Sequence, residues 1–426
     1  LFTRPALKTA LDRMVIKSFA FDVELLTLAV NSGHTIAEAP IELHFGRKLG
    51  CLSPTTVRQV LTDTLGIFYR LRILRYYQAV EPVDYPNPPP LVSVIIACPA
   101  PSPYLAEALS ALQKQTYTTF EVLVLPDAGY IPGPEADGLN LRIIPTGKVR
   151  PAEKRNRGAA LAKGSIIALL DDDAAPLPDW LEKAVPHFGA PTVTGVGGPA
   201  ITPPNDPYWA QVGGRVYQNP LVSGTCRYRY IPGKPRRSID DYPSCNLLVR
   251  AADFRAIGGF SIRYWPGEDT ILCNDLVTRG KRIVYDPWSI VHHHRRALFL
   301  PHLRQIGRYA LHRGYFAKRF PATSLRIAYF MPSLLAIGLL AGFPLALLIR
   351  PLLPPYAIAV ALYAALTFIA AADCRHPLTW LLTWLGIIAT HIWYGLRFLA
   401  GLLATRMPCE VARFDHPAEQ IPPTNP

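Results

Sequence analysis

The stretch Ile166–Pro176, IIALLDDDAAP, passes abruptly from an apolar run to three consecutive carboxylates. Its apolar part, together with the preceding Ser165, predicts a buried strand over Ser165–Leu170, because strands covered on both faces are unbroken apolar runs. Adjacent carboxylates repel one another, and a divalent cation relieves that repulsion. In an extended chain Asp171 and Asp173 point to the same side. The pattern favours a site for Mg²⁺ or Mn²⁺, which prefer oxygen ligands and keep positions open for substrate phosphates; a helix cap or solvated turn is the alternative.

The residues around this stretch alternate between strand and helix patterns. Further strands are expected at Leu91–Ala97, Phe120–Leu125 and Leu141–Ile144, and helices at Tyr104–Gln115 and Ala152–Ala162. Apolar strands separated by helices predict an α/β domain with a doubly wound, mainly parallel sheet. Ligands of such sheets bind beyond the carboxyl ends of the strands, which is where the aspartates lie.

Basic residues open the helix that precedes the acidic strand. They are Lys154, Arg155 and Arg157, in the run Arg150–Gly158. Helix N-termini and arginine side chains both suit phosphate groups. Together with the acidic strand end, they predict a site for a metal-bound diphosphate.

A second acidic pair follows far downstream, in Trp265–Thr270 (WPGEDT). Gly267 lets the backbone approach a ligand closely. Glu268 and Asp269 are candidates for a general base, since a neighbouring like charge raises the pKa of one carboxyl. An ordinary helix N-terminus with acidic residues is the alternative.

Residues 91–320 resemble a family 2 glycosyltransferase with a GT-A fold. The motifs that carry the resemblance are VSVIIA (92–97), QKQTYTTFEVLVLPDAG (113–129), EKRNRGAALAKGSIIALLDDD (153–173), and GGF (258–260) followed by GED (267–269). The first two resemble the nucleotide-binding strands of the family, the third runs into its acidic D-x-D signature, and the last resembles the acceptor side.

The resemblance implies roles for the residues on the donor side. Asp127 would contact the base of the nucleotide, and Arg155 would meet the diphosphate or the ribose. Asp171 and Asp172 would hold ribose, sugar or metal, and Asp173 would contact the metal directly. Two departures from the family pattern lie near the base: Pro126 replaces an aspartate, and Ala97-Cys98-Pro99 replaces the usual turn.

On the acceptor side, the resemblance implies that Asp269 is the catalytic base, with Glu268 beside it. The run Val291–Arg296 (VHHHRR) offers His294 as a further metal ligand, the alternative being a polar strand end or loop. Gln305–Tyr309 (QIGRY) loosely resembles the Q-x-x-R-W element of processive polysaccharide synthases, with tyrosine in place of tryptophan.

The proline-rich segment 81–90 (EPVDYPNPPP) predicts a linker, because proline continues neither helices nor strand ladders. Residues 1–80 resemble the C-terminal part of a polyprenol-phosphate sugar transferase of the same family, on the motifs SFAFDVELL (18–26), GHTIAEAPI (33–41) and RKLGCLS (47–53). They lack the nucleotide-binding half, so Asp22 and Glu24 have no donor site. Arg58–Tyr77 is expected to form an amphipathic helix.

Three apolar stretches lie near the C-terminus: Ile327–Ile349, Tyr356–Ala372 and Leu378–Leu403. A membrane-spanning helix needs about 20 apolar residues, so residues 325–404 predict two or three spans, the middle stretch being short. Residues 405–426 form a tail. The cluster Arg308–Phe320 (RYALHRGYFAKRF) favours the cytoplasmic side for the catalytic domain, and seven scattered cysteines without a C-x-x-C pair favour reduced thiols.

Together these features predict a membrane-anchored, metal-dependent, inverting glycosyltransferase. It would move a sugar from a nucleotide-sugar donor to a lipid-linked or growing glycan acceptor. A processive polysaccharide synthase, a polyprenyl-phosphate sugar transferase and an inactive membrane scaffold remain alternatives. The net charge of +13 suits anionic partners. Nucleic acid is not expected, because many of the basic residues precede the membrane segment rather than forming a stripe with aromatic residues.

Overall fold

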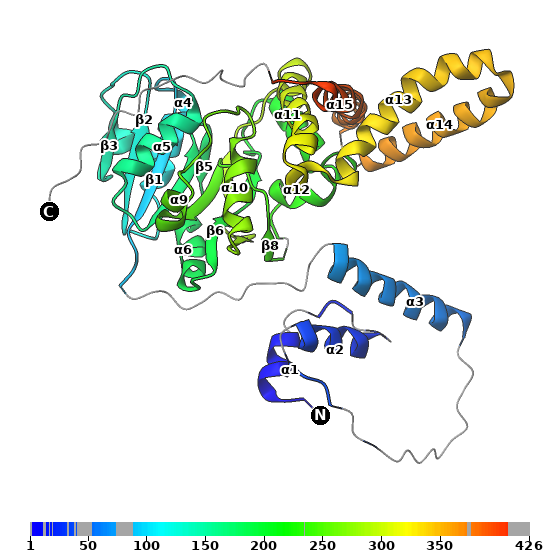
Figure 1. Cartoon of the computed structure of the whole chain (residues 1–426), viewed down its shortest axis with the longest axis horizontal. Coiled ribbons are helices and arrows are strands. Elements are labelled where there is room, and N and C mark those ends of the chain that lie inside the picture. The colour runs from blue at the N-terminus through cyan, green and yellow to red at the C-terminus, as the bar shows by residue number, and fades with distance from the viewer. Residues whose placement is uncertain are drawn as a thin grey trace. The chain divides into compact units, whose positions relative to one another are not determined.

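The computed structural model describes residues 2–11, 14–16, 18, 20–31, 34–37, 40, 53–73, 88–233, 235–372 and 376–407. They belong to two compact units. The first comprises Leu1–Glu81 with Pro235–Ser238, and the second comprises Pro82–Lys234 and Ile239–Pro426. Figure 1 shows the elements of each unit.

The second unit is built on an eight-stranded sheet in the order β3-β2-β1-β4-β9-β6-β10-β8, in which two residues of β8 are counted with the first unit. The strands are β1 (Val92–Ala97), β2 (Phe120–Leu125), β3 (Leu141–Ile143), β4 (Ile166–Asp171), β6 (Val193–Gly197), β8 (Arg237–Ile239), β9 (Asn246–Arg250) and β10 (Arg282–Tyr285). Strands β3, β2, β1 and β4 are parallel, as are β6 and β10, while β9 runs antiparallel between β4 and β6. The doubly wound, mainly parallel sheet expected from the sequence is therefore present.

The register of the parallel strands brings their carboxyl ends together. Ala97 at the end of β1 is opposite both Leu125 of β2 and Asp171 of β4. A second, three-stranded sheet begins just beyond this edge, with β5 (Ala174–Pro176), β7 (Ala200–Ile201) and β11 (Val291–His293). Strand β11 is antiparallel to β5 and pairs His293 with Ala174. The acidic turn thus joins the two sheets.

Helices α5, α9 and α10 pack on the large sheet, and further helices complete the domain. The helices are α4 (Pro103–Leu112), α5 (Pro151–Leu161), α6 (Trp180–Ala184), α7 (Tyr208–Gln218), α8 (Pro220–Ser223), α9 (Ala251–Ala256) and α10 (Glu268–Thr278), with 3₁₀ turns at Pro134–Ala136, Val185–Gly189 and Gly224–Arg229. A Cβ at Gly158 of α5 would lie 2.9 Å from both Ile95 and Leu125, so only glycine allows this approach. The close packing of α5 places its basic first turn at the carboxyl edge of the sheet.

The unit continues into α11 (Leu300–Arg319), α12 (Pro321–Ser324), α13 (Ile327–Leu348), a 3₁₀ turn at Arg350–Leu352, α14 (Leu353–Ala370) and α15 (Pro377–Leu403). Three segments are long and apolar enough to cross a membrane: Ile327–Leu348, Arg350–Ala370 and Pro377–Leu403. The middle one is 21 residues long, longer than the sequence predicted, because the helical backbone already begins at Arg350.

The third apolar helix, α15, packs closely against α11. A Cβ at Gly314 of α11 would lie 2.0 Å from the carbonyl oxygen of Phe398, and one at Gly401 of α15 would lie 1.9 Å from that of Leu311. Small residues of this kind let two helix backbones touch. His391, a polar residue of α15, donates from Nε2 to the carbonyl oxygen of Leu221 at 2.9 Å, and its Nδ1 lies 2.9 Å from the Tyr363 hydroxyl. This helix is therefore part of the packing of the second unit as well as a candidate span.

The first unit consists of α1 (Arg4–Leu11), α2 (Phe21–Asn31), α3 (Pro54–Phe68) and a π-helical turn at Tyr69–Ile73. Glu24 is buried there: it accepts hydrogen bonds from the backbone of Val15 and Ile16 at 3.0 and 2.6 Å and pairs with Arg70 at 3.4 Å. The expected helix at Arg58–Tyr77 starts earlier, at Pro54, where Ser53 caps it. Its last residues, residues 33, 38, 39 and 41 of the second motif, residues 47–52, residues 81–87 of the linker and residues 408–426 of the tail lie outside the described residues.

Candidate active site

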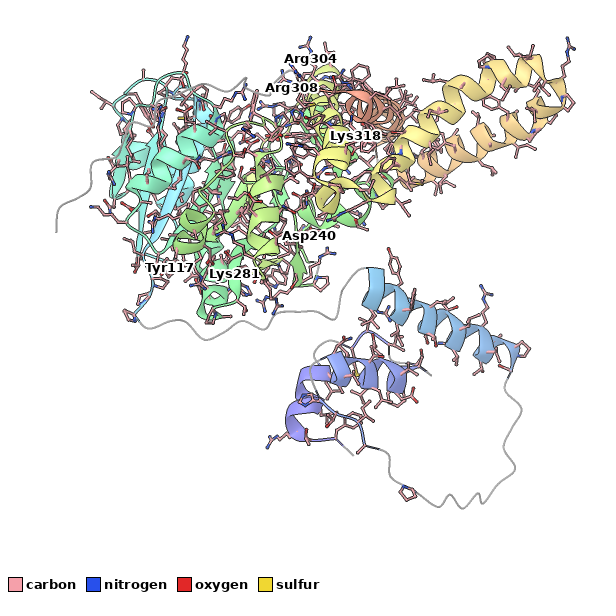
Figure 2. The ribbon with its side chains drawn as sticks, viewed as in Figure 1. Tyr117, Asp240, Lys281, Arg304, Arg308 and Lys318 are labelled. Atoms are coloured by element: carbon pink, nitrogen blue, oxygen red, sulfur yellow. The ribbon has the colours of Figure 1, made fainter. Side chains whose placement is uncertain are left out.

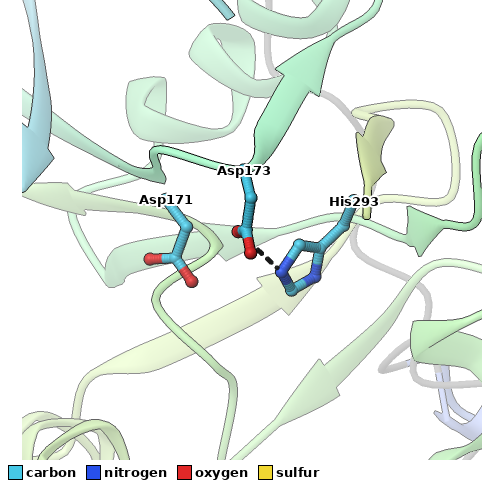
Figure 3. Close-up of side chains that lie close together, drawn as sticks. All are labelled: Asp171, Asp173 and His293. Atoms are coloured by element: carbon cyan, nitrogen blue, oxygen red, sulfur yellow. Dashed lines mark ion pairs between the residues drawn. The ribbon is translucent and has the colours of Figure 1, made fainter. Parts of the chain in front are cut away.

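The acidic turn after β4 meets a histidine from β11. The Oδ1 atom of Asp173 lies 3.1 Å from Nε2 of His293. Asp171, Asp173 and His293 each offer one ligand atom, and these atoms all lie within 4.8 Å of one another. Figure 3 shows the three side chains converging. Two carboxylate oxygens and one imidazole nitrogen at this spacing can hold a divalent cation.

Basic groups keep Asp173 ionised. Burial opposes the charge, but His293 and Arg296 outweigh it and lower the pKa of Asp173 to about 2. The Nη2 atom of Arg296 lies 3.4 Å from Oδ2 of Asp173. Burial and the charges of its two acidic neighbours instead raise the pKa of Asp172 to about 6. The turn therefore contains two kinds of carboxyl, and Asp173 is the one that carries a persistent charge.

Arg155 joins this acidic turn to the second acidic pair. Its side chain is buried, with Nη2 2.6 Å from Oδ1 of Asp171 and Nη1 3.5 Å from Oε1 of Glu268. The guanidinium also lies 5.6 Å from the centre of the Phe260 ring. Local sequence patterns provide no reason to connect Asp171 with Glu268, which are separated by nearly a hundred residues. One buried cation brings both groups into a single site.

The second acidic pair occupies the first turn of α10. Gly267 precedes it with φ of +120° and packs so closely on Phe316 of α11 that a Cβ would lie 2.7 Å from the ring. Burial and the charge of Asp269 raise the pKa of Glu268 to about 8, against the opposing effect of Arg155. Burial also raises the pKa of Asp269, although Arg155 and a hydrogen bond from Ser244 oppose it. Among the described residues, Oε2 of Glu268 and Oδ1 of Asp269 have no hydrogen-bond partner.

Asp127 lies at the carboxyl end of β2, where a buried lysine holds it. Nζ of Lys154 donates to Oδ1 of Asp127 at 2.5 Å and to the carbonyl oxygens of Cys98 and Leu125 at 2.6 and 3.3 Å. This contact connects the two positions that depart from the family pattern, the Cys98 turn and the Pro126-Asp127 pair. Lys154 is therefore engaged within the protein rather than exposed to a phosphate.

The structure brings His293, and not His294, to the acidic turn. His294 bonds instead to Asp206 through Nδ1 and to Glu107 at 2.9 Å through Nε2. The reason is the alternation of a strand, in which neighbouring side chains point to opposite faces. Because His293 of β11 pairs with Ala174 of β5, next to Asp173, the strand register places His293 rather than His294 beside the acidic turn.

Asn156 is a second residue that the sequence left without a role. Its side chain donates to the carbonyl of Phe260 at 2.9 Å and accepts from the Phe260 amide at 2.8 Å. Gly259, with φ of +74°, leaves no room for a side chain there, since a Cβ would lie 2.5 Å from the Asn156 amide oxygen. The contact holds the GGF loop against α5 and places Phe260 over Arg155.

Part of the chain matches known proteins in sequence. Residues 93–258 match the sequence profile of glycosyl transferase family 2. Pre-mycofactocin glycosyltransferases from two strains of Mycobacterium tuberculosis are 32% identical to the chain over 153 residues, covering 34% of this chain. The chain spans 30% of the length of these curated relatives.

Two solved structures are similar at lower identity. The mannosyltransferase PcManGT from Pyrobaculum calidifontis, in complex with GDP-Man and Mn²⁺, is 21% identical, with 80% of this chain and 97% of that chain covered and a TM-score of 0.48. GalNAc-T7 with UDP, GalNAc and Mn²⁺ is 12% identical, with 65% and 61% covered and a TM-score of 0.40.

The family match covers β1 to α9 and includes the acidic turn and the basic first turn of α5. The match confirms the family 2 resemblance over residues 93–258, and the sheet order confirms the doubly wound, mainly parallel sheet predicted from the sequence. Residues 93–258 therefore form a glycosyl transferase family 2 domain with the GT-A fold.

Proposed function

We propose that the chain is a membrane-anchored, metal-dependent, inverting glycosyltransferase that moves a sugar from a nucleotide-sugar donor to a lipid-linked or growing glycan acceptor. The observation that carries this proposal is the convergence of Asp171, Asp173 and His293 at the carboxyl edge of the sheet. Ligands of doubly wound sheets bind at this edge. The family 2 domain supports the same reaction class.

The residues of the acidic turn fit a divalent metal. Their ligand atoms lie within 4.8 Å of one another, and Asp173 is ionised because its pKa is about 2. Mg²⁺ or Mn²⁺ would be held by Asp173 and Asp171, with His293 as the third ligand. Such an ion supplies a Lewis acid for the departing diphosphate.

The donor nucleotide would lie along the carboxyl ends of β1 and β2. Asp127, held by Lys154, would contact the base, and Asp172 would contact the ribose or the sugar. Nε of Arg155 is buried and has no hydrogen-bond partner among the described residues, which supports a donor contact from this atom to the diphosphate or ribose. Arg155 would thus orient the acids with two of its nitrogens and the donor with the third.

Asp269 is the proposed general base. Glu268 is enclosed and paired with Arg155, whereas Asp269 is half-buried and its Oδ1 atom has no hydrogen-bond partner among the described residues, which leaves that oxygen available to an acceptor hydroxyl. The carboxylate would take the proton of that hydroxyl as its oxygen attacks the anomeric carbon and the bond to the diphosphate breaks. A single displacement of this kind inverts the anomeric configuration.

Membrane attachment would involve α13, α14 and α15, each of which is long and apolar enough to span. Basic residues of α11, including Arg308, Lys318 and Arg319, lie just before α13 and favour the cytoplasmic side for the catalytic domain. Figure 2 labels Arg304, Arg308 and Lys318 along this helix. An acceptor carried by a lipid would meet the site from this side.

Calorimetry tests the donor site directly. We expect uridine or guanosine diphosphate to bind the full chain in detergent with Mn²⁺ and to lose affinity in chelator. Incubation with radiolabelled nucleotide sugars and membrane extract should then identify the transferred sugar, and a defined product should have inverted configuration. A chain that binds neither nucleotide, with or without metal, would be the inactive scaffold instead.

Carbonate extraction tests the anchor. We expect the full chain to stay in the washed membrane pellet, and its recovery in the soluble fraction would contradict the topology. Removing everything after Ala322 is a poor test, because it also strips α15 from α11 and α7. Replacing residues 327–370 by a short polar linker keeps α15 and asks whether the first two candidate spans are needed.

A further inference from the structure

The segment Asp240–Ser244 contacts the start of α10, whose first turn carries the acceptor-side acids. The Thr270 hydroxyl donates to Oδ1 of Asp241 at 3.0 Å. Ser244 hydrogen-bonds Asp269 itself. Sγ of Cys273, one helical turn further on, lies 3.6 Å from the carbonyl oxygen of Tyr242. Three contacts from five consecutive residues thus hold the N-terminal part of α10 in place.

Asp241 is the buried centre of this segment. Its Oδ2 atom lies 3.0 Å from Nη2 of Arg313 and 3.5 Å from Nη2 of Arg229. Burial disfavours the charge of Asp241, but the two guanidinium groups and the Thr270 hydroxyl outweigh it and lower its pKa. A carboxylate with partners on both oxygens has little freedom to move. The position of Thr270 is therefore fixed by a charged network and not by packing alone.

The same network reaches the start of the first candidate membrane span. The Arg313 guanidinium lies 4.9 Å from the centre of the Tyr329 ring in α13, and its Nη1 donates to the Ser324 hydroxyl at 3.3 Å. Arg326, the residue before α13, pairs with Asp240 at 2.6 Å. Two neighbouring residues, Asp240 and Asp241, are thus tied to the place where the chain enters α13.

We propose that Asp241 is a positioning residue. Through Thr270 it holds the acceptor-side acids in place, and through Arg313 it couples their position to the packing of the first turn of α13. It touches neither acid directly. Its effect is to hold the α10 turn where Asp269 can take a proton from the acceptor. The inference rests on the proposed function, since it concerns the same acid pair.

The decisive variant is Thr270→Val, which removes the hydroxyl and keeps the shape. Asp241→Asn would leave two buried guanidinium groups without a counter-charge and endanger folding. A displacement of reacting groups by about 1 Å costs up to about a hundredfold in rate, so we expect Thr270→Val to lower kcat by roughly 10- to 100-fold. Binding of nucleotide diphosphate with Mn²⁺ should not change, because the donor side keeps its own contacts.

Matched variants separate positioning from folding. Thr270→Ser restores the hydroxyl and should recover kcat to within about twofold of the wild type. Thr278→Val removes a hydroxyl at the other end of α10, where it bonds only within the helix, and should leave kcat unchanged. A normal kcat in Thr270→Val, or no recovery in Thr270→Ser, overturns the positioning role.

The coupling to α13 is tested by Tyr329→Leu in the full chain reconstituted in vesicles. We expect kcat to fall with unchanged nucleotide binding, whereas Tyr329→Phe, which keeps the ring beside Arg313, should behave as the wild type. Equal kcat values for the two variants overturn the coupling. A wild-type chain that transfers no sugar would instead count against the proposed function, so the two failures are distinguishable.

Discussion

The two groups of carboxylates in this site have opposite surroundings. On the donor side, Asp173 faces His293 and Arg296, and its pKa falls to about 2. On the acceptor side, Glu268 and Asp269 face one another with Arg155 as a shared cation, and the pKa of Glu268 rises to about 8. The same residue types thus serve two purposes: a fixed charge suits a cation, and a carboxyl that holds its proton more tightly suits proton transfer.

In this site, the charged neighbours of an acid decide its role more than its burial does. Asp173 and Glu268 are both largely enclosed, and enclosure alone raises the pKa of either. Two basic neighbours reverse the effect at Asp173, whereas an acidic neighbour reinforces it at Glu268.

Asp269→Asn should have the largest effect on turnover. It keeps the shape of the side chain and removes the proposed base, and general-base assistance is worth about 10²–10⁴-fold in rate. We expect kcat to fall by that factor while nucleotide diphosphate and Mn²⁺ bind as in the wild type. Asp275→Asn, on the same helix, serves as the control. Normal turnover, or a product that keeps the donor's configuration, would show that Asp269 is not the base.

Asp173→Asn should act on the other half of the site. Removing the charge that His293 and Arg296 hold in place should weaken Mn²⁺-supported nucleotide-diphosphate binding by about 100-fold or more. The exposed Asp179, six residues along the chain, offers Asp179→Asn as a control with unchanged binding. Calorimetry with and without chelator measures both. If the wild-type affinity is the same in chelator, Asp173 has no metal role.

Glu268→Gln should do less harm at neutral pH. Because the pKa of Glu268 is about 8, the side chain is uncharged at pH 7 and glutamine imitates it. We expect kcat at pH 7 to fall by less than about tenfold. A loss as large as that of Asp269→Asn would reverse the assignment of the two acids.

The same variant gives a test of stability against pH. The folded state keeps a proton on Glu268 that the unfolded state releases above its ordinary pKa of 4.5. The stability from the protonated group is therefore fully present below about pH 4.5 and is lost as pH rises to about 8. Glutamine cannot ionise, so the Tm of Glu268→Gln should rise relative to the Tm of the wild type as pH increases from about 5 to about 8. A difference that stays constant with pH would contradict the raised pKa.

Asp22→Asn should have the smallest effect. Asp22 is exposed at the start of α2 in the first unit and accepts a hydrogen bond only from the neighbouring Val23 amide among the described residues. Surface changes of this kind alter stability by about 0.5 kcal/mol or less. We expect transfer by the family 2 domain to be unchanged in membranes. Lost turnover with a normal Tm would show that residues 1–80 contribute to the site.

Much of the fold was predictable because its signals are local. The apolar runs of β1, β2 and β4 and the helix patterns of α4 and α5 require only short-range periodicity, and they predicted the parallel sheet and the edge where the aspartates lie. The family motifs then identified the GT-A fold. The length of the second apolar segment was underestimated, since proline and arginine at its start hid a helical backbone from Arg350 onward.

The order of residue types is enough to show which residues can carry charge, where the strands end and which helices are apolar enough to span. Which of those charges meet depends on how the chain folds in three dimensions. Strand register selected His293 over His294, and the close packing of α5 put Arg155 between Asp171 and Glu268. The packing of α11 on α10 and α13 brought Arg313 to Asp241. These contacts join residues tens to over a hundred positions apart, and an electrostatic interaction depends on distance in space, which local patterns do not encode.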